Sequence, residues 1–138
     1  QSQNLHLTLV HPWYENNIEK FIKNLSKFTF SKTFEVAFDQ VSKGPSLRPR
    51  LIWITGPGQS SLTKLQKDLA RFLKRPREKH STPHITIARF KMKEAILVPE
   101  INEIIELKFD VSEITLFESR LSPLGANYFP IEHLKLEI

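Results

Sequence analysis

The sequence predicts an α+β fold, a domain in which strands and helices alternate along the chain. Stretches with a polar–apolar period of two alternate with stretches whose apolar residues recur every three or four positions. The order is strand, helix, strand, strand, helix, followed by strand, helix, strand, strand, so the second half resembles the first. The 138 residues, 40% of them hydrophobic, are enough for one domain with its own core.

The first third of the chain predicts a strand, a helix and a second strand. Residues 5–10 alternate as a strand does, and Pro12 ends the pattern. A second alternating strand is expected at 34–38, and the composition of 42–49 (Ser-Lys-Gly-Pro-Ser-Leu-Arg-Pro) is typical of a loop. The helix between the two strands is predicted by apolar residues at helical spacing: Ile18, Phe21, Ile22, Leu25 and Phe28.

The central part predicts a buried strand, a helix and another strand. Residues 51–55 form a short apolar strand, followed by the turn sequence Gly56-Pro57-Gly58, which lacks the Gly-Lys-Ser/Thr ending of a phosphate-binding loop. The next helix is capped by Ser60 or Ser61 and ends at Pro76. A basic loop, 74–81, leads into an alternating strand at 84–90. The inward face of the helix consists of Leu62, Leu65, Leu69, Phe72 and Leu73.

The last third predicts a helix and two strands. The helix is expected to begin near Pro99 and to turn Ile101, Ile104 and Ile105 inward. Two strands, 108–117 and 128–138, are expected to be joined by a turn at 122–126.

Composition excludes several classes of chemistry. The chain has no cysteine, which excludes disulfides, thiolate metal sites and cysteine nucleophiles. No apolar run approaches the roughly 20 residues that span a bilayer, and no charged-then-apolar leader is visible, so a cytoplasmic protein that does not contact membranes is expected. The chain opens at Gln1 with a strand pattern almost at once.

Positive charge is concentrated in one segment. The net charge is +5, but residues 64–93 hold ten Lys or Arg against Asp68 and Glu78. Residues 94–118 hold seven acidic residues against Lys108 alone. This distribution favours a local surface for a polyanion such as RNA, and a solvated helix face with a basic loop explains it equally well.

Two tetrapeptides carry the chemistry: His6-Leu7-Thr8-Leu9 and His84-Ile85-Thr86-Ile87. Because side chains alternate along a strand, His and Thr share one face while the aliphatic residues share the other. An imidazole with its ordinary pKa of about 6.5 can accept or donate a proton near neutrality, so two of them suit general acid–base cleavage of a phosphodiester. Hydroxyls can hold the phosphate oxygens. One His per strand without an acidic partner at i+2 is a poor metal-ligand set, so no metal is expected.

A single His-x-Thr-x pattern is weak, since any half-buried strand can contain it. Two copies, each within a predicted strand and each backed by aliphatic residues, favour function over structure. His11 and His133 are expected to be ordinary surface residues, and His80 is ambiguous.

The two motifs in this order resemble the two-histidine phosphoesterase superfamily, and within it the RNA 2′,3′-cyclic phosphodiesterase or 2′-5′ RNA ligase group. The resemblance rests on the segments Asn4-Leu5-His6-Leu7-Thr8-Leu9, Arg50-Leu51-Ile52-Trp53-Ile54, Pro83-His84-Ile85-Thr86-Ile87-Ala88-Arg89, Leu116-Phe117-Glu118-Ser119-Arg120-Leu121 and Gly125-Ala126-Asn127-Tyr128. It implies a single catalytic domain, residues 1–138, of two lobes related by pseudo-two-fold symmetry. Two antiparallel sheets would flank a central groove, helices would lie outside, and each lobe would contribute one motif strand. Members usually have a strand and a helix before the first motif, which this chain is not expected to contain.

The resemblance also implies catalysis without a metal or nucleotide cofactor, and it implies roles for individual residues. His6 would protonate the O3′ leaving group, His84 would activate water, and Thr8 and Thr86 would bind phosphate oxygens; the acid and base labels exchange in the reverse reaction. Arg89 is a candidate phosphate ligand, although strand alternation puts it on the face opposite His84 unless the strand bulges. An ion pair at the surface is the alternative for Arg89.

Further candidates would bind RNA beyond the phosphate. Arg75, Arg77 and Lys79 precede the second motif, and Tyr128 could stack on a base; a solvated loop and core packing are the respective alternatives. The sequence thus predicts a monomeric enzyme that hydrolyses RNA 2′,3′-cyclic phosphate ends to 2′-phosphates without metal, with reversible 2′-5′ ligation as an additional activity. A phosphodiesterase for 2′-5′ oligonucleotides or small cyclic nucleotides, and a catalytically weak RNA-binding module, are the alternatives.

Overall fold

The computed structural model describes residues 5–29, 32–76 and 82–137. Within these residues the fold is α+β, as the sequence predicts, and it consists of two antiparallel sheets and two α-helices in place of the three helices expected. The chain divides into two compact units, each assembled from three separate stretches. The pseudo-two-fold arrangement of two lobes, with one motif strand in each, stays a prediction. No helix in the described part of the chain is long and apolar enough to cross a membrane.

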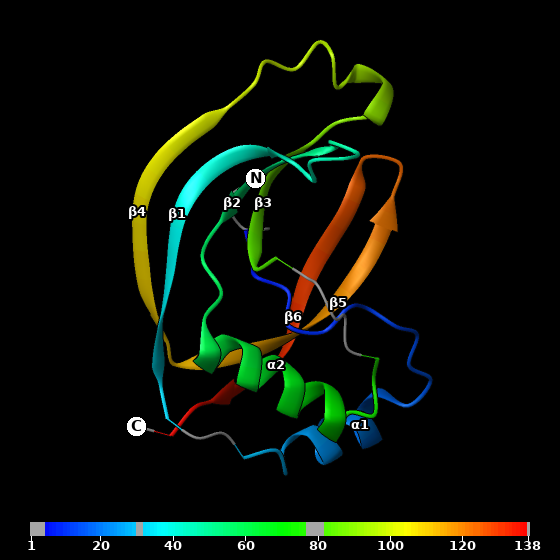
Figure 1. Cartoon of the computed structure of the whole chain (residues 1–138). Helices are drawn as coiled ribbons and strands as arrows, with labels where there is room; N and C mark the ends of the chain where they lie inside the picture. The colour runs from blue at the N-terminus through cyan, green and yellow to red at the C-terminus, as the bar shows by residue number, and fades with distance from the viewer. Residues whose placement is uncertain (1–4, 30–31, 77–81, 138) are drawn as a thin grey trace. The chain divides into compact units, whose positions relative to one another are not determined.

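The first unit, residues 1–8, 36–59 and 78–109, contains a four-stranded antiparallel sheet. Its order is β3-β2-β1-β4, and Figure 1 shows these strands side by side. The strands are β1 (Phe34–Gly44), β2 (Leu51–Thr55), β3 (His84–Arg89) and β4 (Asn102–Val111). β2 lies between β1 and β3 and has the bounds that its apolar run predicts.

The buried face of this sheet comes from alternate residues of β1 and β2. Val36 and Phe38 of β1 are fully buried, and the ring of Phe38 stacks on Phe109 of β4 with centroids 5.9 Å apart. Leu51 and Thr55, at the two ends of β2, are also buried. The sheet therefore has one inner face, formed by the first half of β1 and the two ends of β2.

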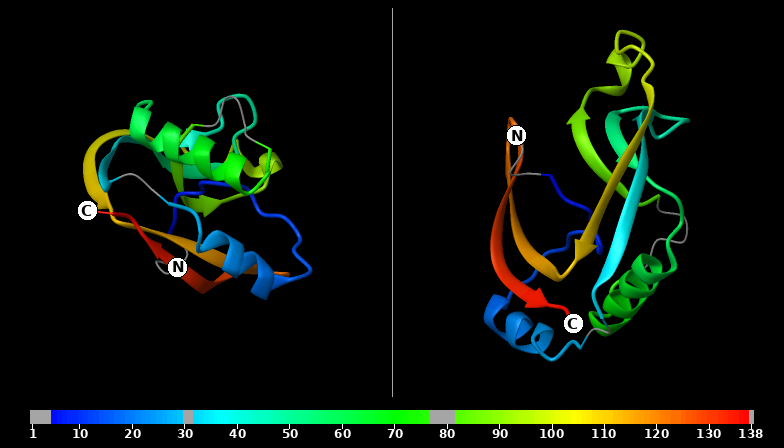
Figure 2. Two further views of the ribbon diagram at one scale, coloured as in Figure 1. Left: turned by 90° about the horizontal axis from the view of Figure 1, so that it is seen from below. Right: turned by 90° about the vertical axis from the view of Figure 1, so that its left-hand side faces the viewer.

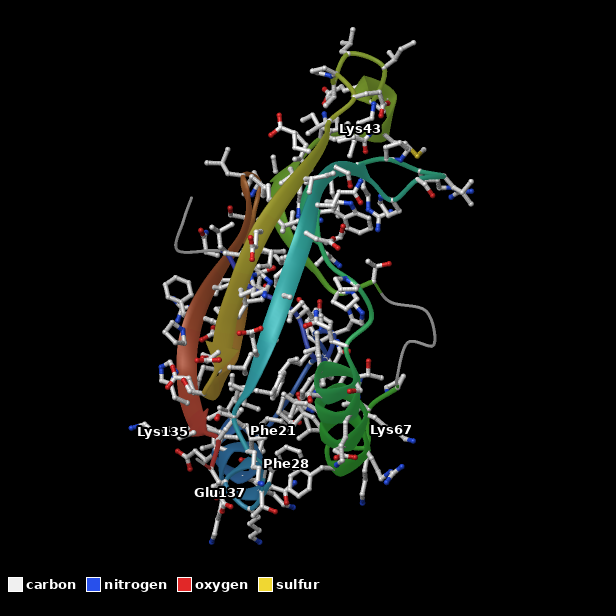
Figure 3. All side chains as sticks on the ribbon, turned by 60° about the vertical axis from the view of Figure 1, so that its left-hand side comes forward. Phe21, Phe28, Lys43, Lys67, Lys135 and Glu137 are labelled. Atoms are coloured by element: carbon white, nitrogen blue, oxygen red, sulfur yellow. The ribbon has the colours of Figure 1, made fainter. Side chains whose placement is uncertain are left out.

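A segment between β3 and β4 contains the 3₁₀ helix η2 (Met92–Glu94) and is anchored by one lysine. The ammonium group of Lys43 donates to the carbonyls of Ala95 and Val98, both at 3.1 Å, and pairs with Glu100 at 2.7 Å. Figure 3 shows Lys43 on β1 beside this segment. These contacts hold the long connection close to the sheet.

The second unit, residues 9–35, 60–77 and 110–138, combines two helices with a hairpin. The elements are α1 (Ile18–Leu25), α2 (Ser60–Phe72), β5 (Glu113–Ser122) and β6 (Gly125–Lys135). The side chain of Asn17 caps α1 by accepting from the amide of Lys20 at 3.0 Å. The hairpin of β5 and β6 can be followed in Figure 2, and Gly125 at its turn has φ +118°, a conformation that favours glycine.

The core of the second unit joins α2 to the chain's last strand. Leu65 of α2 and Leu136 are buried together, and partly buried apolar side chains pack against them: Leu9, Phe28, Phe34, Val111, Ile114 and Leu134. Phe28 also packs against Phe72 with ring centroids 5.0 Å apart. The helices expected at 18–28 and 60–73 are therefore confirmed, α1 being one turn shorter.

Four predictions of secondary structure were wrong. The single strand expected at 108–117 is divided between the end of β4 and the start of β5, which belong to different sheets. The helix expected near Pro99 is instead β4, in which Ile104 is 93% exposed. The loop expected from residue 42 begins only after Gly44, because residues 42–44 pair with β2 and extend β1. The strand expected at 5–10 is reduced to one bridge residue, Leu7, since bends follow at 9 and 10.

Candidate functional site

The two His-x-Thr pairs lie beside each other in the first unit. Leu7 forms an antiparallel bridge with Ile85 of β3. Carried one residue to either side, this register sets His6 opposite Thr86 and Thr8 opposite His84. His6 and His84 then occupy diagonal positions of an antiparallel pair, which are about 7–8 Å apart between backbone positions. The bridge thus gathers two imidazoles and two hydroxyls at one edge of the sheet.

All four side chains are half-buried, so each is partly open to solvent. Leu7 and Ile85, the aliphatic residues between them, belong to the opposite face by alternation. This is the division of faces that the motif predicts. The roles of His6, His84, Thr8 and Thr86 stay predictions.

His84 is the best-defined side chain of the site. Its Nδ1 lies 2.8 Å from the carbonyl oxygen of Thr82, two residues earlier. A carbonyl only accepts, so Nδ1 carries the proton and Nε2 holds the lone pair of the neutral ring. The imidazole also packs against the indole of Trp53, with centroids 4.9 Å apart and an interplanar angle of 49°. His84 is therefore set up to accept a proton at Nε2.

Trp53 and Thr82 are neighbours of the site that sequence reasoning missed. Trp53 was noticed only as part of an apolar strand that resembles the family's central strand. The sequence contains one signal for this contact. Trp53 and Thr55 alternate onto one face of β2, and β3, which carries His84, pairs with that strand.

A β-bulge changes the position of Arg89. Trp53 pairs with Thr86, but the next residue, Ile52, pairs with Ala88, so Ile87 is the extra residue. Leu51 then pairs with Arg89. Because Leu51 shares its face of β2 with Trp53, the bulge assigns Arg89 by register to the face of His84 and Thr86. The bulge that the sequence analysis named as the condition is therefore present, and phosphate binding by Arg89 stays a prediction.

The tentative RNA-binding residues divide between the second unit and the undescribed part. The guanidinium of Arg75 lies 5.0 Å from the centre of the Trp13 ring, and its Nε is buried without a hydrogen-bond partner in the described residues. Arg77 and Lys79, like His80, lie outside the described residues. Tyr128 is half-buried on β6 and meets Phe117 edge to face, with centroids 6.1 Å apart.

Charged groups of the hairpin are paired with each other. Arg120 donates to Glu118 at 2.9 Å and lies 4.2 Å from the centre of the Phe129 ring. The hydrogen bond and charge of Arg120 lower the pKa of the Glu118 carboxyl, and the same contact raises the pKa of Arg120. His133 contacts Thr115 at 3.1 Å and Glu113 at 3.4 Å, as an ordinary surface histidine can.

Within the described residues, no group of three or more His, Asp or Glu side chains is arranged to hold a metal ion. The side chains that the site brings together are two imidazoles, one of them with Nδ1 bonded to a backbone carbonyl, and two threonine hydroxyls. Together these groups can transfer protons to and from an anion and hold its oxygens.

Comparisons with known proteins identify the family and the fold. A model of the 2′-5′ RNA ligase superfamily matches residues 1–122. No curated protein matches by sequence. Among solved structures, Escherichia coli LigT in complex with 3′-AMP is 26% identical, with a TM-score of 0.69 over 99% of this chain and 78% of that one.

Two further solved structures share the fold. A structure described as a phosphoesterase is 26% identical, with a TM-score of 0.71 over 96% of this chain and 77% of that one. A Thermus thermophilus protein is 22% identical, with a TM-score of 0.72 over 96% and 78%. The chain is thus similar in fold to phosphoesterases over nearly its whole length.

Proposed function

The chain belongs to the 2′-5′ RNA ligase superfamily, and from this premise we propose that it hydrolyses the 2′,3′-cyclic phosphate ends of RNA to 2′-phosphates. The observation that carries the proposal is the bridge between Leu7 and Ile85, which brings the two His-Thr pairs to one edge of the sheet. Superfamily membership supports a hydrolase of phosphate esters. LigT structures hold 3′-AMP, phosphate, ATP or NADP+, which supports a nucleotide substrate.

The proposed reaction needs two proton transfers. Water attacks the cyclic phosphorus while Nε2 of His84 takes a proton from it. The bond from phosphorus to O3′ breaks, and His6, in its protonated form, donates a proton to O3′. The product carries its phosphate on O2′. Each general acid or base step is typically worth about 10²–10⁴-fold in rate.

The hydroxyls and the arginine act on the phosphate. Thr8 and Thr86 donate hydrogen bonds to its non-bridging oxygens, and Arg89 supplies a positive charge. These contacts favour the transition state, in which more negative charge lies on the oxygens than in the bound substrate. The same sequence with a 5′-hydroxyl of RNA in place of water would join ends through a 2′-5′ linkage, and its reverse, in which O3′ attacks phosphorus and the 5′-hydroxyl leaves, would cleave that linkage.

The test compares two substrates in the presence of a chelator and without ATP. RNA ending in a 2′,3′-cyclic phosphate should be converted to the 2′-phosphate, with one oxygen from labelled water in the product. Faster cleavage of a 2′-5′ oligoadenylate would replace the proposed substrate with that one. Loss of activity on chelation would contradict the proton-transfer mechanism. If the wild-type chain binds RNA without turnover and His6→Ala and His84→Ala bind it equally well, the chain is a binding module.

A further inference from the structure

The packing of Trp53 against His84 is part of a chain of contacts that begins on β1. Trp53 pairs with Thr86, and Thr55 pairs with His84, so Trp53 is the diagonal neighbour of His84 on the same face. The ring centroids are 4.9 Å apart. The indole therefore covers one side of the imidazole.

The indole itself is held by two small residues of β1. Its Nε1 donates to the hydroxyl oxygen of Ser42 at 3.0 Å. Ser42 is also the ladder partner of Trp53. A Cβ added at Gly44 would overlap the six-membered ring of the indole, so the ring lies directly against that backbone. The hydrogen bond fixes one edge of the indole, and the absence of a side chain at Gly44 lets the ring lie directly on the backbone of β1.

These contacts give His84 two restraints of different kinds. The carbonyl of Thr82 accepts from Nδ1 at 2.8 Å and selects the tautomer. A single hydrogen bond leaves the ring free to swing about it, whereas an aromatic ring packed against the imidazole at a tilt of 49° restricts that motion. An indole also attracts a cation held against its ring, which accommodates the imidazolium that forms when His84 takes a proton.

We propose that Trp53 is a positioning residue that holds the imidazole of His84 in one orientation, through the contacts of Trp53 with Ser42 and Gly44. The inference rests on the proposed role of His84 as the group that accepts a proton, and it adds the residues that keep Nε2 in place. Groups that orient a metal-bound imidazole typically contribute about 10–100-fold to affinity or activity, and the same range is expected here.

Nitrogen-15 NMR of the His84 ring tests the proposal without depending on catalysis. In the wild-type chain His84 should be in the Nδ1–H tautomer, with cross-relaxation between its ring protons and those of the Trp53 indole. Trp53→Leu should give a mixture of tautomers and lower kcat about 10–100-fold with little change in KM. Trp53→Phe, which keeps an aromatic ring, should restore most of the Nδ1–H tautomer and most of kcat. Ser42→Ala should change both by less than Trp53→Leu does.

Ile52→Ala is the matched control, because Ile52 neighbours Trp53 on β2 but belongs to the other face. This variant should leave the tautomer of His84 and kcat unchanged. The proposal is overturned if Trp53→Leu keeps the wild-type tautomer and kcat, or, should that variant not fold, if the wild-type chain shows no contact between the two rings. If the wild-type chain shows the contact and the tautomer but no turnover, the proposed function fails while the positioning by Trp53 stands.

Discussion

Leu7 and Ile85 are partners in an antiparallel bridge, although they come from the first and the third stretch of the chain that build the first unit. The bridge adds the start of the chain to the outer edge of β3, next to the order β3-β2-β1-β4. Neither residue takes part in the proposed chemistry. Their pairing is nevertheless what sets the register of His6 and Thr8 against His84 and Thr86.

Removing either imidazole should abolish most of the activity. His6→Ala and His84→Ala are each expected to lower kcat/KM for RNA ending in a 2′,3′-cyclic phosphate by at least about 10²-fold. The double variant should be little worse than either single one, because the two groups act in one step. His133→Ala is the control, because the contacts of that ring are with Thr115 and Glu113 of the hairpin. Near-wild-type turnover by either single variant would exclude the paired mechanism.

The threonine hydroxyls should contribute less than the histidines. Thr8→Val and Thr86→Val keep the side-chain shape and remove one hydrogen bond to a charged oxygen, worth about 1.5–3 kcal/mol. This corresponds to a loss of roughly 10–100-fold in kcat/KM, and Thr→Ser at either position should recover most of it. Thr115→Val, at a hydroxyl bonded to His133, should have no effect on turnover. An equal loss in the serine variants would point to packing rather than to the hydroxyl.

Arg89 provides a test of the bulge at Ile87. If the bulge brings Arg89 to the face of His84, Arg89→Gln should raise KM and weaken inhibition by inorganic phosphate, because one charged hydrogen-bond donor is lost. The expected loss of affinity for substrate and for phosphate is about 10–100-fold, because such a hydrogen bond contributes about 1.5–3 kcal/mol. Lys93→Gln, in the 3₁₀ helix after β3, is the charge-matched control. If both variants show the same small, salt-dependent effect, Arg89 contributes only to the general positive charge of the surface.

The sequence predicted correctly the elements whose residue pattern fits only one kind of secondary structure. The apolar run of β2 and the leucine face of α2 fall where they were expected. β4 was misread because Ile101, Ile104 and Ile105 have helical spacing after a proline. A period of two was present in the same segment, in Ile105, Leu107, Phe109 and Val111, and pairing with β1 decides in favour of it.

The end of β1 was misread for a different reason. Ser42 and Gly44 belong to a composition that is typical of loops, yet both lie in the strand and contact Trp53. Small residues are needed there because an indole occupies the space that larger side chains would take. Such a requirement comes from a residue of another strand, so the local sequence does not reveal it. The motif residues were found because their pattern is repeated, whereas the residue that packs against His84 occurs once.

Stability should respond differently at two glycines. Gly44→Ala puts a methyl group into the indole of Trp53 and should lower the free energy of unfolding by about 1–3 kcal/mol. Gly58→Ala meets no atom within 4 Å and should change it by no more than about 0.5 kcal/mol. Urea unfolding followed by circular dichroism measures both. Equal stability of the two variants would mean that the indole does not lie against Gly44 in solution.

The dependence of rate on pH should identify which histidine is the acid and which is the base. A general base must be unprotonated, so kcat/KM should fall as the pH drops; a general acid must be protonated, so kcat/KM should fall as the pH rises. The wild-type profile should therefore have two limbs. The residual activity of His84→Ala should lose the acidic limb, and that of His6→Ala should lose the alkaline limb.

The hydrogen bond from Nδ1 of His84 to Thr82 favours this assignment, because it leaves Nε2 free to accept a proton in the neutral ring. If the limbs are lost in the opposite order, His6 is the base in hydrolysis, and a wild-type profile with a single limb would mean that only one imidazole transfers a proton.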